Sequence, residues 1–260
     1  HDALPISGTG NGTGNDNTGI FIKSGGVVET TNGTIDLEGF SGSGANFNHG
    51  ILLQDANSRI SSINGDITLT GANNAAQTSA GTTNHGIFIR VDGLVQSSGN
   101  ITLTGTTNGT GLNREGISIV RGGRVESTGT GMITMTGNGG NGGIGSDGNQ
   151  GIVVLDPNTR VTSVDGDILL RGISRGTGTN NYGIWLGRAG DGVVRTTGTG
   201  NITLEGIISG IGNNSEGIFF GDGGAIEAIG TGNITLTADE ITIASNLAEI
   251  TGTNRLQLQP

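Results

Sequence analysis

The chain has 260 residues, of which 54 are glycine and none is cysteine, and its formal net charge is −10. The lack of cysteine excludes a disulfide framework and a thiolate metal site, and the acidic balance argues against a nucleic-acid partner, because phosphate binding needs clustered Lys and Arg. Glycine-rich chains are often disordered, but here Ile, Val and Leu recur at fixed offsets with period-two alternation, which predicts ordered strands.

Residues 1–18 precede the repeat that fills the rest of the chain. We expect them to be a lead-in that is partly non-native or an incomplete coil. They contain no basic region and no apolar stretch of the length of a signal peptide or a membrane helix. We therefore expect no membrane insertion of this segment and place any export signal outside it.

From residue 19 onward, a glycine precedes one short apolar strand in each repeat. The seven copies span residues 19–22, 50–53, 86–89, 116–119, 151–154, 183–186 and 217–220. Their glycines are 31, 36, 30, 35, 32 and 34 residues apart, and self-similarity at such a period is typical of a solenoid.

Two further apolar segments follow in each repeat. The second pairs an apolar residue with a small one two positions on, as in Val95 and Ser97 or Val125 and Ser127. The third reads Ile-x-Leu or a close variant, as at Ile101 and Leu103. Period two directs one set of side chains inward and the other outward. A glycine then opens a polar segment of about a dozen residues with the composition of a loop.

The last stretch, 238–260, repeats the three segments without the polar one. This indicates that a coil consists of three strands and that the polar segment is an insertion at one corner. The sequence therefore predicts an all-β parallel β-helix of about eight coils. Residues 19–237 form seven coils of about 33 residues, and 238–260 form an eighth, compact coil that is truncated at its end.

The outward positions of the first strand form the most unusual column of the repeat. Besides Ser118, they are apolar or aromatic, and we identify a candidate ligand-contact column made of Phe21, Leu52, Phe88, Val153, Trp185 and Phe219. An exposed apolar stripe of this kind marks a binding site, whereas soluble proteins rarely leave such a patch open. The insertions are therefore expected to fold back over it.

Other chemistry is predicted only weakly. His49 and His85 occupy equivalent positions in adjacent coils and Glu115 follows in the next, an arrangement that would suit a metal-binding ladder, but a tolerant polar corner is the better interpretation. Outward acids sit singly, and we predict no catalytic residue, metal or cofactor, hence no enzyme. Outward threonine pairs at residues 68 and 70, 102 and 104, 134 and 136, and 235 and 237 suggest ice binding as a minor alternative.

The pattern Gly-Ile-x-Ile…Gly-Gly-x-Val-x-Ser-Thr…Gly-x-Ile-Thr-Leu-Thr-Gly resembles the repeat regions of bacterial filamentous-haemagglutinin-like large exoproteins and giant adhesins. The resemblance implies a right-handed β-helical stalk that is secreted or displayed at the cell surface, with a structural or adhesive role. Expected partners are glycans or surface proteins and flanking coils of the same polypeptide. The alternative is a carbohydrate-binding or carbohydrate-acting β-helix protein.

Overall fold

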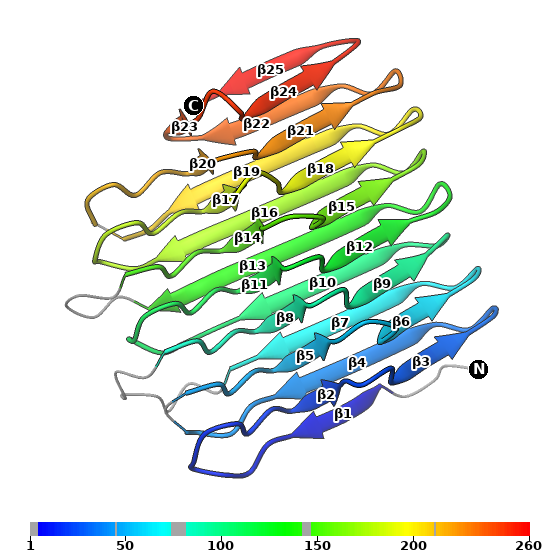
Figure 1. Ribbon diagram of the computed structural model, residues 1–260, viewed down its shortest axis with the longest axis vertical. Helices are drawn as coiled ribbons and strands as arrows, with labels where there is room; N and C mark the ends of the chain where they lie inside the picture. The colour runs from blue at the N-terminus through cyan, green and yellow to red at the C-terminus, as the bar shows by residue number, and fades with distance from the viewer. Residues whose placement is uncertain (1–4, 45, 74–81, 142–146, 211) are drawn as a thin grey trace.

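The computed structural model describes residues 5–44, 46–73, 82–141, 147–210 and 212–260. Within these ranges every regular element is a β-strand, and all strand pairs between the coils are parallel (Figure 1). The strands form three sheets, each containing one strand from every coil. The predicted parallel β-helix with three strands per coil is confirmed.

Sheet 1 contains the strands that the repeat glycines precede. Its strands, in spatial order, are β2 (Ile20–Ile22), β5 (Ile51–Gln54), β8 (Ile87–Arg90), β11 (Ile117–Val120), β14 (Ile152–Leu155), β17 (Ile184–Leu186), β20 (Ile218–Phe220) and β23 (Ile241–Ile243). Its spatial order therefore follows the order in the sequence, and β2 to β23 span seven full turns.

Sheets 2 and 3 follow the same order. Sheet 2 consists of β3 (Val27–Thr30), β6 (Arg59–Ser62), β9 (Leu94–Ser97), β12 (Arg124–Ser127), β15 (Arg160–Ser163), β18 (Val193–Thr196), β21 (Ala225–Ala228) and β24 (Glu249–Gly252). Sheet 3 consists of β1 (Ile6–Thr9), β4 (Ile35–Phe40), β7 (Ile67–Ala72), β10 (Ile101–Thr106), β13 (Ile133–Asn141), β16 (Ile168–Arg175), β19 (Ile202–Ile208), β22 (Ile234–Ala238) and β25 (Leu256–Gln259). Strand β1 lies within the expected lead-in and pairs with β4.

The core is a set of ladders of like side chains. Ile101 pairs with Ile67 on one side and Ile133 on the other, and all three are fully buried. In sheet 2, Val95 pairs with Val125, and the inward hydroxyls of Ser97 and Ser127 donate to turn carbonyls at 2.6 Å. Burial of one such aliphatic side chain contributes about 1.5–3 kcal/mol. A side chain is buried only where neighbouring coils cover it, so the stacking of coils, rather than any one coil, forms the core.

The polar insertions leave and re-enter the rod between sheet 3 and sheet 1, as the longer loops on the left of Figure 1 show. Two glycine columns line this passage. A Cβ at Gly105 would overlap the carbonyl oxygen of Gly116 and lie 2.7 Å from its carbonyl carbon. In the coil without an insertion, Ala238 takes the position of Gly105, and Glu240 precedes β23 where a glycine precedes the other strands. The glycines therefore serve the close approach of two backbones at each insertion.

Candidate ligand-binding groove

The predicted ligand-contact column is a real column of sheet 1. The strand register places Phe21 beside Leu52, Leu52 beside Phe88, Val153 beside Trp185, and Trp185 beside Phe219, with Ser118 between Phe88 and Val153. These side chains alternate with inward residues such as Ile89 and Leu186, which belong to the main core. The column thus occupies the outer surface of the sheet, as period two requires.

Most of the column is buried in a second apolar cluster. Leu52, Phe88 and Val153 are buried together with Val120 and Leu155, and Trp185 packs against them. Phe21, on the edge strand β2, remains 44% exposed. The middle of the column is therefore packed among neighbouring side chains of sheet 1, whereas its end at Phe21 is open.

A groove of about 860 Å³ nevertheless runs above this floor. One wall consists of the residues that precede the repeat glycines, including His85, Glu115, Gln150 and Tyr182. The other wall consists of residues at or just beyond the strand ends: Arg90, Val120, Arg121, Leu155 and Arg188. The rim consists of Phe47, Thr83, Asn113, Asp147, Gly148 and Asn180 from the insertion corner. The column is thus neither covered nor flat, because side chains on both flanks recess it.

An aromatic cluster fills one end of the groove. The rings of Tyr182 and Phe219 are stacked with centroids 4.4 Å apart, and Trp185 lies edge-on to both at 5.5 and 6.2 Å. The indole Nε1–H of Trp185 donates to the carbonyl of Gly187 at 3.0 Å, which fixes the orientation of the ring. Burial, with a smaller effect of the nearby Glu216 carboxylate, raises the pKa of Tyr182 to about 12.

A histidine pair occupies the other end. His49 and His85 are stacked with centroids 5.1 Å apart, and Phe88 contacts both rings. The backbone N–H of His85 donates to Nδ1 of His49 at 3.3 Å, so that nitrogen is unprotonated. Burial, followed by the positive charges of His85 and Arg90, holds the pKa of His49 well below its ordinary value of 6.5.

The side chains of His49, His85 and Glu115, which a metal-binding ladder would require, do not point at one shared position. Nδ1 of His49 accepts a backbone hydrogen bond, and Nδ1 of His85 contacts the Glu115 carboxylate instead of a shared position. Among the described residues, no group of three His, Cys, Asp or Glu side chains is arranged to hold a metal ion.

Three arginines line the strand-end wall of the groove. Arg188 is paired with Asp156 by two hydrogen bonds of 2.9 and 3.1 Å, and its guanidinium lies 6.0 Å from the centroid of Trp185. Arg90 lies over Phe88 at 5.2 Å. Within the described ranges neither Arg90 nor Arg121 has a carboxylate at ion-pair distance. Burial and then the charge of Arg121 lower the pKa of Arg90, and Asp55 opposes them in part.

This arginine wall was not predicted from the sequence. Arg90 immediately follows the Gly-Ile-x-Ile segment, at the position that Gln54, Val120 and Leu155 occupy in other coils. Arg90 is the last residue of β8, and the turn begins directly after it. The alternation rule applies within a strand, so it does not decide the direction of a side chain at this boundary. The sequence signal for this wall was the position directly after the Gly-Ile-x-Ile segment, compared from coil to coil. In neighbouring coils this position places Arg90 and Val120 side by side.

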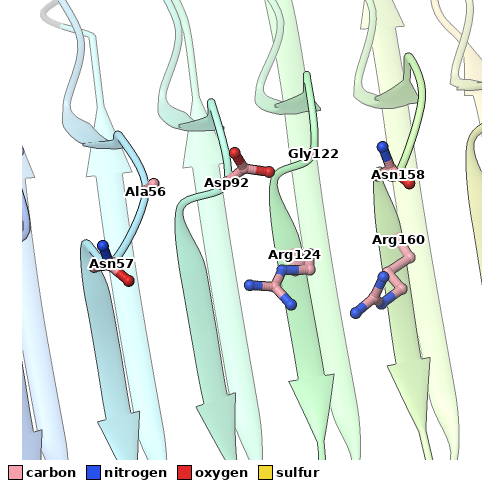
Figure 2. A pocket seen from close by; sticks show the side chains of 7 residues that line it. All are labelled: Ala56, Asn57, Asp92, Gly122, Arg124, Asn158 and Arg160. Carbon is pink, nitrogen blue, oxygen red and sulfur yellow. The ribbon is translucent and has the colours of Figure 1, made fainter.

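A second, smaller hollow of about 280 Å³ lies at the turn between sheets 1 and 2 (Figure 2). Figure 2 shows Arg124 and Arg160 side by side at the starts of their strands, with Asp92 and Asn158 on the turns above. Both arginines already contact the Glu126 carboxylate, at 3.7 and 3.0 Å. Their charge is therefore partly compensated within the protein, and this smaller hollow is the weaker candidate.

The threonine pairs form a regular array over only three coils. Thr102 pairs with Thr68 and Thr134, and the second member of each pair follows the same register. The array ends at Asp36 and Glu38 on one side and at Leu169 and Arg171 on the other.

Comparison of the chain with protein-family models, with curated proteins and with solved structures finds no match. In the described part of the chain, no helix has the length and apolar character needed to cross a membrane.

Proposed function

We propose that the chain is a structural and adhesive β-solenoid segment of a secreted or cell-surface bacterial exoprotein. In this role the stacked coils act as a stalk, and the groove on sheet 1 is the surface that contacts a partner. The observation that supports it most is the continuous coil-to-coil pairing of three parallel sheets from β2 to β24, which stacks the coils into a rod.

The end coils support a stalk whose coils continue into flanking coils of the same polypeptide. Apolar side chains are exposed at both ends, including Ile6 and Val27 at one and Ile243, Leu256 and Leu258 at the other. The strands at these ends also have one unpaired edge each. Such edges and apolar columns are protected in repeat proteins by a further repeat or a cap.

A non-enzymatic role fits the placement of the outward acids. Glu126 contacts two arginines, Glu205 contacts Arg171, and Glu227 contacts Arg195. Acids in such pairs are charge partners of a solvated surface and do not form the facing carboxylates that hydrolysis of a glycosidic bond needs.

The alternative, a carbohydrate-binding or carbohydrate-acting protein, draws on the aromatic end of the groove. Near that end, burial and then the charge of Glu240 raise the pKa of Glu216, the direction that a general acid needs. Ice binding has less support, because the threonine array spans only three coils.

The test combines localisation, a glycan array and a polysaccharide-degradation screen. Expression from the native gene followed by antibody labelling of intact cells should detect the segment outside the cell. Binding without cleavage supports an adhesive surface, and binding to no glycan leaves a spacer. Cleavage of any polysaccharide, abolished in Glu216→Gln, would replace the proposal by the enzymatic alternative. Confinement of the protein to the cytoplasm would refute it.

A further inference from the structure

We propose that the groove on sheet 1 binds an extended acidic polysaccharide, with sugar rings on its aromatic floor and a carboxylate of the chain between Arg90 and Arg121. This inference rests on the proposed function, since it names the chemistry of the partner at the same groove.

The groove fits a linear chain rather than a compact ligand. Its lining runs from Phe88 on β8 to Phe219 on β20, which are four coil steps apart. At about 4.8 Å per parallel strand, this distance is roughly 19 Å. Each coil along the groove contributes one outward strand residue to the floor and residues on either side of it to the two walls. A ligand therefore meets a similar set of positions at every coil step. A polymer of similar rings matches such a repeating site.

The backbone of the groove disfavours an extended peptide. A peptide that binds along a sheet gains its affinity from unpaired N–H and C=O groups at a sheet edge. Strands β8, β11, β14 and β17 each have a neighbour on both sides, so the floor has no free strand edge. On the floor, a ligand must therefore be recognised through side chains, which suits a chain of hydroxyl-bearing rings.

The aromatic side chains are placed to contact sugar rings. Trp185 and Phe219 are half-buried and line the groove, Phe88 is buried in its floor, and the ring of Trp185 is held by its hydrogen bond to Gly187. Rigid aromatic rings provide large contact areas at low entropic cost. The rim adds the exposed amides of Asn113 and Asn180, which can exchange hydrogen bonds with hydroxyl groups.

The charge of the groove indicates an anion. The lining carboxylates lie away from the arginine wall: Glu115 contacts His85, and Asp147 at the rim accepts a hydrogen bond from the Thr179 N–H at 2.6 Å. Within the described ranges neither one is at ion-pair distance from Arg90 or Arg121. Arg90 and Arg121 lie in adjacent coils and repel each other. Planar guanidinium groups bind carboxylates with two parallel hydrogen bonds. A bound carboxylate would relieve this repulsion, within a protein whose net charge is −10.

The experiment uses Trp185, the only tryptophan of the chain, as a fluorescent reporter. The intact protein is titrated with oligogalacturonate and with the same oligomer as its methyl ester, which keeps the shape and removes the charge. The acidic oligomer is expected to bind at least about tenfold more tightly, a difference of about 1.4 kcal/mol. This preference should weaken as salt is added.

Variants then locate the charge. Arg121→Gln and the double variant with Arg90→Gln are expected to lose the preference for the acid. Arg171→Gln removes an arginine of sheet 3 outside the groove and should leave affinity within twofold; circular dichroism and the thermal midpoint report folding of each variant. Equal binding of acid and ester, or an unchanged preference in folded Arg121→Gln, would overturn the anionic site while leaving an adhesive groove. Absence of binding to either oligomer would overturn the inference and leave the stalk role untouched.

Discussion

Substitution of Gly105 by alanine tests the glycine columns at the insertion corner. The added Cβ would overlap the carbonyl oxygen of Gly116 on the next coil. The nearest obstacle is the Gly116 backbone, which has no side chain that could rotate away, and Cγ1 of the buried Ile117 lies 2.7 Å from the added atom as well. Overpacking of this kind costs about 1–3 kcal/mol. Movement of the Gly116 strand would also strain the hydrogen bonds from the N–H groups of Gly116 and Ile117 to the next coil, both 3.0 Å long.

Loss of those two hydrogen bonds adds about 1 kcal/mol each, so the free energy of unfolding should fall by roughly 3–5 kcal/mol in total. Urea unfolding followed by circular dichroism measures it. The matched control is Gly14→Ala, where an added Cβ meets no atom within 4 Å; it should be neutral or slightly stabilising. If Gly105→Ala unfolds at the same urea concentration as the wild type, close backbone approach is not the reason for glycine at this corner.

Three further predictions follow from single residues. The pKa of His49 is lowered in the folded state, so the unfolded chain takes up a proton that the folded chain does not, and stability is full above about pH 6.5 and falls as the pH drops below it. Urea midpoints of the wild type should show this pH dependence, and His49→Gln should lose most of it. Equal pH dependence in the two proteins would contradict the assignment. Tyr182 is the only tyrosine, so phenol absorbance should titrate near pH 12, and a midpoint near 10 would show that the ring is not buried. Phe220→Ala empties a fully buried core position and should destabilise the rod by about 3–5 kcal/mol in chemical denaturation; a loss below about 1 kcal/mol would mean that neighbouring coils close the cavity.

The sequence predicted the strands and their inward residues because each depends on period two alone. Ile101, Leu103 and Val125 are inward in the structure as the alternation requires. The compact last coil separated the insertion from the repeat, since Ile241 and Ile250 keep the register without it. Strand β1 was not predicted, because Ile6 to Thr9 contains one large apolar residue and its pairing comes from β4.

The groove was predictable only in part. The period-two alternation predicts that Phe88 and Trp185 lie on the outer surface of sheet 1. Their exposure depends on how far the side chains of the two groove walls extend above that surface. That height is set by residues outside the strand pattern, such as His85, Tyr182 and Arg188. It also depends on which side chains pair across coils, as Arg188 does with Asp156 over 32 positions of sequence. Contacts of this range require the register, which the repeat length alone does not give where insertions differ in length.

The parallel stacking has a mechanical consequence for a rod with its termini at opposite ends (Figure 1). The hydrogen bonds between coils run along the rod axis, so a pull on the two termini opens the ladder of a terminal coil before it loads the interior. The paired strand starts Ile20 and Ile51 are 31 residues apart, and one released coil therefore frees roughly 100 Å of extended chain. Such a segment would lengthen stepwise under tension and limit the force that reaches whatever is bound to it.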